Sequence, residues 1–343
     1  MSTRIPIAFA LAFVVSAGPM YAGGSAEQPR ASKTVSVVLV VRSPDDAARA
    51  VEQGARQAAK DLGNVEVTLE APDAPTDAAQ GLLLERLGSR PMNAIVIMPS
   101  EAGTRIDHLM GALFKFQDAG VSVVSLDQKI GVGTHILDVT SATERDEGRA
   151  LARMISSQTG DRGEIGILGA SPDSDAQNAL IGAVRKELAA HPAMHLDAIL
   201  YGNAAPDQAA RNVGSLLKAY PRISGLIAVT QNGLAAASQA VKDGGLGGRV
   251  QVTGLGTPAV MQPYLDDGTC GQMIADGLID AGHAATCVAV LLARGRIKGA
   301  LGEKMSVGRI GTIAMDQTGR VAVSQPTVIT RDTIASFAKA ASN

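Results

Sequence analysis

The sequence predicts an α/β protein made of two doubly wound parallel-sheet lobes joined by a hinge. Short β-branched runs alternate with amphipathic helical segments along almost the whole chain. Helix-starting residues follow several of these runs directly, as in βαβ units. A glycine-rich stretch at 128–135 interrupts the alternation, and the same pattern then resumes. Two runs of βα units with a break between them indicate two lobes.

The first run opens with Ser36–Val41, a continuous apolar segment that is typical of a strand buried on both faces. Ser43 is predicted to cap the next helix, with Pro44 at its first position and acidic residues in its first turn. The strands and helices that follow are expected at Val65–Leu69, Thr76–Leu87, Ala94–Met98, Thr104–Ala119 and Val121–Leu126. Ile136–Val139 is expected to be a short extended segment that crosses to the second lobe.

The second run begins with a helix at Thr143–Ser156. Its strands are expected at Glu164–Leu168, Leu196–Tyr201, Gly225–Val229, Arg249–Leu255 and Thr269–Ala275. Its helices are expected at Asp175–Ala189, Pro206–Ala219, Asn232–Lys242 and from Pro258 to Asp267, and another follows the last strand. The tail is expected to hold extended pieces at Val307–Ala314, Val321–Val323 and Thr327–Thr330.

Composition limits the function classes. The chain has 343 residues, of which 46% are hydrophobic and 19% charged, with a formal net charge of −2. This is an ordinary globular balance, and the net charge predicts no basic surface for nucleic acid. Residues 1–22 have the pattern of a secretory signal peptide, because Arg4 precedes a short apolar core, Ile5–Val15, and then small residues. The alternative is a buried first helix, and residues 23–33 are predicted to be a linker.

Export bears on the two cysteines, Cys270 and Cys287, because disulfides form outside the cytoplasm. A bridge needs α-carbons within about 7 Å of each other. Two buried free thiols are favoured over a bridge.

One stretch also resembles a known family. Residues 254–264 read Gly-x-x-Thr-Pro-x-x-Met-x-Pro-Tyr, followed by Asp267-Gly268-Thr269 and a small-residue helix that ends in Leu-x-x-Gly at Gly295. This stretch resembles the periplasmic solute-binding proteins of ABC sugar importers, of the ribose-binding-like type I class. Within that class it is most similar to the branch that binds rhamnose and the autoinducer-2 signal.

The resemblance implies a multi-crossing hinge, with one crossing near Met273–Gly277 and another in the tail. The N-terminal lobe is expected to comprise 34–138 and 277–310, and the C-terminal lobe 139–276 and 311–343. It further implies a monomeric periplasmic receptor that passes a small polar, sugar-like ligand to the membrane subunits of an ABC permease. The alternative is a receptor that presents its ligand to a chemotaxis or sensor-kinase system.

Candidate ligand-binding residues follow the strands, since ligands of open parallel sheets bind beyond the carboxyl ends of strands. Asp127 ends an apolar strand, where a carboxylate can accept two sugar hydroxyls, or else cap local backbone amides. Arg42 and Ser43 follow the first strand. The guanidinium of Arg42 can bind hydroxyls or a carboxylate, or else pair with the acids of the next helix. The resemblance also implies ligand-binding roles for Asp127 and for a basic residue at Arg42.

The second lobe offers a matching set. The resemblance implies an Asp-Gln pair after a Ser-Pro, which falls on Asp175 or on Gln177 depending on a one-residue gap. The alternative is that Asp173 or Asp175 caps the helix. Of the family's Pro-Asp-Ala-Asn after a later strand only Asn232 remains, and Gln231 replaces the alanine. The autoinducer-2 signal itself is therefore not the expected ligand. Asp276 matches a further polar position of the family.

The chain has no Trp and only 3% aromatic residues, so we expect a small, highly polar ligand held by hydrogen bonds. The sequence holds no Gly-x-Ser-x-Gly, no phosphate-binding Walker loop and no His-Glu-x-x-His. We therefore predict no catalytic residue, no metal site, no cofactor and no enzyme activity.

Overall fold

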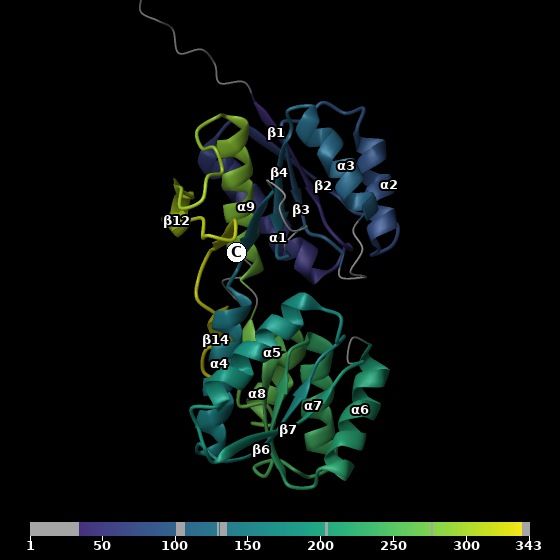
Figure 1. The fold of residues 1–343 in the computed structure, drawn as a ribbon, viewed down its shortest axis with the longest axis vertical. Helices are drawn as coiled ribbons and strands as arrows, with labels where there is room; N and C mark the ends of the chain where they lie inside the picture. Colours follow the sequence, from purple (N-terminus) through teal and green to yellow (C-terminus); the bar gives the residue numbers. More distant parts are fainter. Residues whose placement is uncertain are drawn as a thin grey trace, which may run out of the picture. The chain divides into compact units, whose positions relative to one another are not determined.

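The computed structural model describes residues 34–100, 107–128, 130, 136–202, 205–275 and 277–337. The predicted signal peptide and linker lie outside these residues. Two six-stranded sheets organise the chain from residue 34 onward (Figure 1).

The first sheet has the strand order β13-β5-β4-β3-β1-β2, and all its pairings are parallel. Its strands are β1 (Val35–Val40), β2 (Val65–Glu70), β3 (Ala94–Ile97), β4 (Ser122–Leu126), β5 (Leu137–Thr140) and β13 (Arg320–Ala322). Helices α1 (Asp46–Leu62) and α9 (Leu278–Ala293) pack together, and α2 (Asp77–Leu87) packs on α3 (Asp107–Asp118). Figure 1 shows α9, from late in the chain, beside α1.

The alternation of side chains along β1 explains the two helical layers. Val37 and Leu39 belong to the core under α1 and α9, whereas Val38 and Val40 belong to the core under α2 and α3. A strand with a helical layer on each face buries every side chain, which is why the run reads as uninterrupted β-branched and apolar residues.

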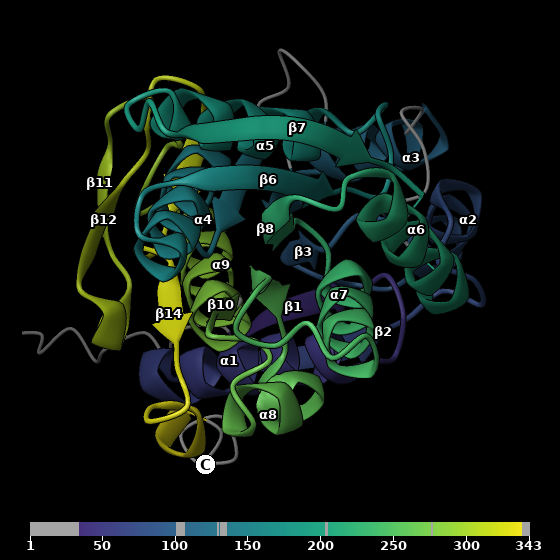
Figure 2. The same ribbon diagram turned by 90° about the horizontal axis from the view of Figure 1, so that it is seen from below.

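The second sheet has the order β14-β10-β9-β8-β6-β7, in which only the β10–β14 pairing is antiparallel among the described pairings. Its strands are β6 (Gly163–Leu168), β7 (Met194–Leu200), β8 (Ile223–Ala228), β9 (Gln251–Gly256), β10 (Gln272–Ala275) and β14 (Thr327–Ile329). Its helices are α4 (Glu144–Thr159), α5 (Asp175–Leu188), α6 (Pro206–Ala219), α7 (Gln231–Asp243) and α8 (Pro258–Asp266). Figure 2 shows this sheet with α4 and α5 beside each other and α7 lying between α6 and α8.

The fold confirms two doubly wound parallel lobes with several crossings. The chain passes from the first sheet to the second between β5 and α4, returns between β10 and α9, and passes again between β13 and β14. The tail corrects one expectation, because β13 joins the first sheet by pairing with β5, whereas the expected lobe bounds place all of 311–343 with the second lobe.

Two local expectations are also corrected. Asp45, and not Ser43, caps α1: its carboxylate accepts from the Ala48 N–H, and the Ser43 hydroxyl donates to the same carboxylate. Val307–Ala314 is not a single extended piece. Its two glycines with positive φ, Gly308 (58°) and Gly311 (93°), turn the chain between β11 (Lys304–Ser306) and β12 (Thr312–Ala314), which pair as an antiparallel hairpin.

The contact between α1 and α9 in the first lobe depends on glycine. A Cβ added to Gly54 of α1 would lie 1.9 Å from the carbonyl oxygen of Ile279 in α9, and one added to Gly282 would lie 2.4 Å from the carbonyl oxygen of Val51. The backbones of α1 and α9 therefore touch, which docks the helix that follows the second crossing firmly onto the first lobe.

Candidate functional site

Each sheet has a point where the connections that leave two adjacent strands run to opposite faces of the sheet. Ligands of such sheets bind in the crevice at that point. In the first sheet it lies between β1 and β3, and in the second between β6 and β8. The candidate residues Arg42 and Ser43 follow β1, and Asp127 follows β4, which pairs with the other side of β3. Gln177 and Asp175 belong to the helix after β6, and Gln231 and Asn232 to the helix after β8.

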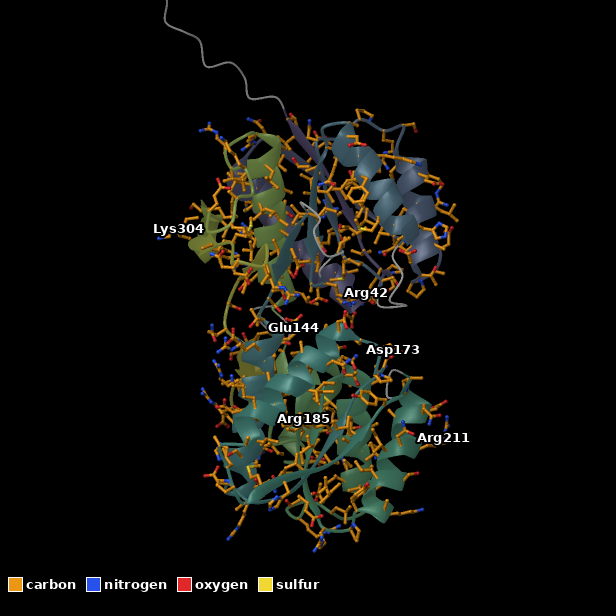
Figure 3. The ribbon with its side chains drawn as sticks, viewed as in Figure 1. Arg42, Glu144, Asp173, Arg185, Arg211 and Lys304 are labelled. Atoms are coloured by element: carbon orange, nitrogen blue, oxygen red, sulfur yellow. The ribbon has the colours of Figure 1, made fainter. Side chains whose placement is uncertain are left out.

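Arg42 and Asp127 are brought together from 85 residues apart. The Arg42 guanidinium donates from Nη2 to Asp127 Oδ2 at 3.2 Å, and the side chains are 16% and 28% exposed. The sequence left open a pairing of Arg42 with Asp45 or Asp46. Arg42 forms an ion pair with Asp127. Although burial opposes the shift, the Ser43 hydrogen bond and also the charge of Arg42 lower the pKa of Asp45. Figure 3 shows Arg42 at the end of the first lobe. The pair presents a cationic donor beside an anionic acceptor, which is a suitable surface for vicinal hydroxyls.

Asp127 also has an unusual backbone. Its φ is +72°, a left-handed conformation that is uncommon outside glycine, asparagine and aspartate. Its N–H donates to the Val139 carbonyl of β5 at 2.8 Å, which holds the residue at the end of the β4–β5 ladder. A residue held in this sparsely populated conformation at a strand end is an arrangement found at ligand sites.

A buried glutamine, Gln80 of α2, fixes the ends of β1 and β3. Its Nε2 donates to the carbonyl oxygens of Val41 at 3.2 Å and Met98 at 2.8 Å, and its Oε1 accepts from the Ser100 N–H at 2.8 Å. The side chain is fully buried. Gln80 therefore sets the spacing of the two segments that carry Arg42 and Ser100. The sequence offers no signal for this role except a polar residue on the inner face of an amphipathic helix.

In the second lobe, Gln177 of α5 has a related role. Its Oε1 accepts from the Ala170 N–H at 2.8 Å, beyond the end of β6. A Cβ on Gly169 would lie 3.0 Å from the Tyr201 ring and 3.4 Å from Gln177 Oε1, so Gly169 leaves room for both side chains. Ser174 caps α5, and Asp175 is an exposed first-turn residue that does not cap it. Gln177 is thus tied to the strand end, and Asp175 is not.

Gln231 and Asn232 begin α7 and are exposed. Thr230 caps this helix through its Oγ1, which accepts from the Gly233 N–H at 3.1 Å. The two amide side chains therefore project from a capped helix end beside β8. Asp276 lies outside the described residues.

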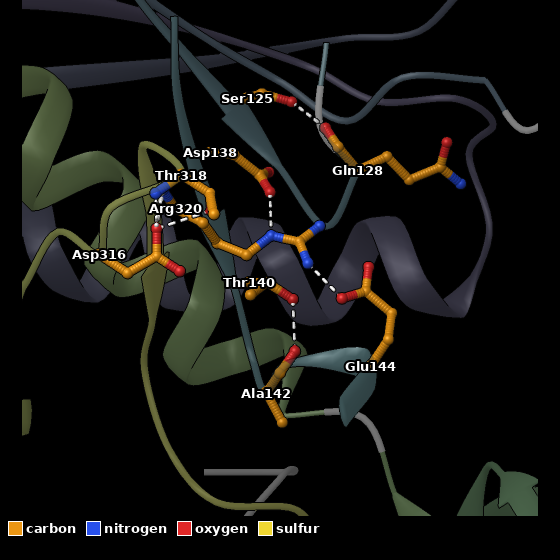
Figure 4. A network of polar contacts seen from close by, with 9 residues as sticks. All are labelled: Ser125, Gln128, Asp138, Thr140, Ala142, Glu144, Asp316, Thr318 and Arg320. Carbon is orange, nitrogen blue, oxygen red and sulfur yellow. Dashed lines mark hydrogen bonds and ion pairs between the residues drawn. The ribbon is translucent and has the colours of Figure 1, made fainter. Parts of the chain in front are cut away.

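An ion network that the sequence did not indicate lies beside the first crossing (Figure 4). Arg320 of β13 donates from Nε to Asp138 Oδ2 of β5 at 2.7 Å, and from Nη1 to the Glu144 carboxylate of α4. Burial raises the pKa of Asp138 to about 6, opposed by the charge and hydrogen bond of Arg320 and assisted by the negative charges of Asp127 and Glu144. The carboxylates of Asp138 and Glu144 raise the pKa of Arg320 in spite of its burial.

The two cysteines are free and buried, in agreement with the favoured prediction. Burial raises the pKa of both thiols to about 12. His283, between α9 and α1, lies 3.1 Å from Asp61 Oδ2 through Nε2 and 3.8 Å from the Cys287 sulfur through Nδ1. A fully buried thiol that stays protonated has neither access to a substrate nor nucleophilic character, so this cluster is part of the core packing.

Among the described residues, no group of three or more His, Cys, Asp or Glu side chains is arranged to hold a metal ion. A concavity on the solvent face of α1 is lined by Arg49, Glu52, Gln53, Arg56, Gln57 and Lys60. Its charges pair along the helix, as Arg56 does with Glu52. In the described ranges, every helix is too short or too polar to traverse a lipid bilayer.

Comparison with known proteins decides the family. The family profile described as "Periplasmic binding protein domain" matches residues 36–297. The chain belongs to this family.

Solved structures of similar fold agree with the membership of this chain in the periplasmic binding protein family. A sugar ABC transporter protein from Actinomyces odontolyticus matches with a TM-score of 0.78 and 24% identity, over 88% of this chain and 97% of that one. A solute-binding protein from Clostridium phytofermentas with bound L-rhamnose matches with a TM-score of 0.76 and 24% identity, over 90% and 99%. LsrB from Clostridium saccharobutylicum, in complex with AI-2, matches with a TM-score of 0.74 and 21% identity, over 88% and 99%. At 21–24% identity, these structures show that the chain has the fold implied by the resemblance.

Proposed function

We propose that this protein captures a small polar ligand, a sugar or sugar derivative, between its two lobes and delivers it to the permease of an ABC importer. The observation that carries the proposal is the Arg42–Asp127 pair at the end of β1 and β4, in a fold of the periplasmic binding protein type. The pair has no net charge and offers both hydrogen-bond donors and acceptors. It therefore suits a hydroxylated ring better than it suits a fully charged ligand.

The proposed ligand contacts are Arg42, Ser43 and Asp127 on the first lobe and Gln177, Gln231, Asn232 and Asp276 on the second. Asp175 is the weaker alternative to Gln177, because its side chain is exposed and is not held at the strand end. A ligand that contacts both sets stabilises the closed arrangement of the lobes by its differential contacts, and the permease then recognises that arrangement. The ligand is released unchanged, so the protein acts without catalysis.

The lobes in this proposal follow the sheets. The first lobe comprises the residues around β1–β5, α9 and β13, and the second those around β6–β10 and β14. Residues 1–22 serve as a signal peptide that is removed on export, and the mature protein works as a monomer in the periplasm. Sequencing the N-terminus of protein recovered from the periplasm tests the export step.

The binding site is tested with Asp127→Asn. Asparagine keeps the size of the side chain and tolerates a positive φ, so the variant retains the fold while it loses the carboxylate. Pentoses, deoxyhexoses, hexoses and sugar acids are screened on the natural protein by thermal shift, and Kd is then measured by calorimetry. Loss of one charge-assisted hydrogen bond weakens binding by about 1.5–3 kcal/mol, or roughly 10- to 100-fold.

Asp118→Asn, an exposed change on α3, is the control and should leave Kd unchanged. Equal Kd values for Asp127→Asn and the natural protein would show that the site is elsewhere. Failure of every sugar and sugar acid to bind the natural protein would refute the proposed function. Recovery of a chemically altered ligand would point to an enzyme.

A further inference from the structure

The three crossings between the lobes run side by side. The Val323 N–H donates to the Thr140 carbonyl at 2.9 Å, and the Ser324 N–H donates to the Ser141 carbonyl at 2.8 Å, so the first and third crossings are hydrogen-bonded to each other. A Cβ on Gly277, in the second crossing, would lie 3.4 Å from Ser141 Cβ and 3.9 Å from Ser324 Oγ. The chain can change lobe orientation only by backbone rotations in these links, because the elements before and after them are packed into one sheet or the other.

Arg320 binds a carboxylate on each side of the first crossing. Asp138 lies on β5, directly opposite Arg320 in the first sheet, and is 1% exposed. Glu144 is the first residue of α4, which packs on α5 and on β8, β9 and β10 of the second lobe. The link Ser141–Thr143 separates the two carboxylates. A rotation in that link therefore moves Glu144 relative to the Arg320–Asp138 pair.

We propose that the Arg320–Glu144 ion pair is a tie across the hinge that restricts the lobe orientations open to the protein and thereby sets its ligand affinity. The affinity part rests on the proposed function, since it assumes that the ligand is bound between the lobes. The restriction of lobe orientation does not depend on any ligand.

The first-lobe end of the tie is rigid. Asp316 Oδ1 accepts from the N–H groups of Thr318 and Arg320 at 2.7 and 3.0 Å, which fixes the turn before β13. Asp138 then holds the guanidinium at Nε, and this leaves Nη1 directed to Glu144. The planar fork of arginine is needed for two carboxylates at once, and a lysine ammonium has no equivalent geometry. Figure 4 shows the guanidinium between Asp138 and Glu144.

The tie is more than a solvated surface pair. The side chains of Arg320 and Glu144 are only 14% and 20% exposed, and Asp138 is buried with an Oδ1 that has no hydrogen-bond partner among the described residues. Solvent screens such a pair less than an exposed one. Its loss therefore shifts an equilibrium between lobe orientations measurably, whereas the loss of an exposed pair does not.

The test measures the distance between the lobes directly. Spin labels are attached at Asp118→Cys on α3 and Ser215→Cys on α6, two exposed positions on opposite lobes. Cys270 and Cys287 are buried and stay unlabelled in the folded protein. Distance distributions are recorded by double electron–electron resonance without ligand, in the natural background and in Glu144→Gln and Arg320→Lys.

The matched control is Glu187→Gln. Glu187 on α5 pairs with Arg149 and Arg153 of α4 and is 24% exposed, so the control removes the same charge from an ion pair that lies wholly within the second lobe. We expect the distance distribution to broaden in both tie variants and to stay unchanged in the control. Circular dichroism confirms that each variant is folded, and if Arg320→Lys does not fold, the isosteric Glu144→Gln suffices.

Affinity is the second measurement. With a sugar that binds the natural protein, Kd should change by about fivefold or more in Glu144→Gln and remain constant in Glu187→Gln. Distributions of equal width in the natural protein and both tie variants would overturn the proposal. An unchanged Kd despite a broader distribution would overturn the effect on affinity. If no sugar binds the natural protein, the proposed function fails, but the distance measurement still decides whether the tie exists.

Discussion

Gln80 provides the most direct test of how the first lobe positions its strand ends. Gln80→Leu replaces the carboxamide with an apolar group of similar size. It leaves three buried backbone groups, at Val41, Met98 and Ser100, without the partner that Gln80 supplies at 2.8–3.2 Å. An unsatisfied buried polar group costs about 1–3 kcal/mol, while the leucine recovers some free energy by apolar burial. We expect the free energy of unfolding to fall by about 3–5 kcal/mol.

The assay is urea denaturation followed by circular dichroism. Gln57→Leu is the control, because Gln57 lies on the exposed face of α1 and donates only to Asp61 among its described contacts. The control should change the free energy of unfolding by about 0.5 kcal/mol or less. A loss below about 1 kcal/mol in Gln80→Leu would refute the reasoning, because it would mean that water or a rearranged backbone supplies the missing hydrogen bonds at little cost.

The remaining predictions concern burial. Because Asp138 has a pKa raised from 3.8 to about 6, the folded state holds more protons than the unfolded state between these pH values. The contribution of Asp138 to the free energy of unfolding therefore falls as pH rises through this window, by about 3 kcal/mol in all. About 2 kcal/mol of that fall lies between pH 4.5 and 7, and Asp138→Asn should remove it in urea titrations at these two pH values. Gly54→Ala should destabilise the protein by about 3 kcal/mol or more, because the added methyl group forces α1 away from α9. Gly111→Ala is the control, since Gly111 on α3 faces open space, and it should stabilise the protein by about 0.5–1 kcal/mol. Thermal unfolding of the two variants measures both changes. Cys270 and Cys287 should not react with a thiol reagent until denaturant is added. Prompt reaction of either thiol in the native state would contradict their burial.

The order and type of the elements were predictable from the sequence because the central strands of both lobes are covered on each face. β1 and β3 are almost wholly buried, and only a nearly continuous apolar run satisfies that environment. The helices carry their own signals, such as the Thr143 cap of α4. These signals are local, so a single sequence contains them.

The predictions that were wrong concern features that depend on competition between neighbouring residues or on distant partners. Ser43 and Asp45 both suit a helix start, and the hydrogen bonds decide for Asp45. The sheet that receives β13 is decided by its pairing with β5, since Arg320 lies 182 residues from Asp138. Neither composition nor periodicity encodes such a partner.

The candidate site was likewise predictable only in part. Arg42 and Asp127 were predictable as polar residues at strand ends, but their pairing required the order of β1, β3 and β4 in the sheet. The role of Gln80 was not predictable, because no sequence pattern distinguishes an inward-facing glutamine of an amphipathic helix from a surface residue. Its role appears only when the carbonyls of two strands are placed around it.

The candidate site and the hinge tie share one pair of strands. Asp127 donates its N–H to Val139, and Val139 is the neighbour of Asp138, which anchors Arg320. The negative charge of Asp127 also acts on Asp138, raising its pKa. A ligand that draws Asp127 toward its hydroxyls therefore acts on the same β4–β5 ladder that carries the first-lobe end of the tie. Since packed strands transmit small shifts and do not absorb them, ligand contact and hinge restraint are expected to be coupled and not independent contributions to affinity.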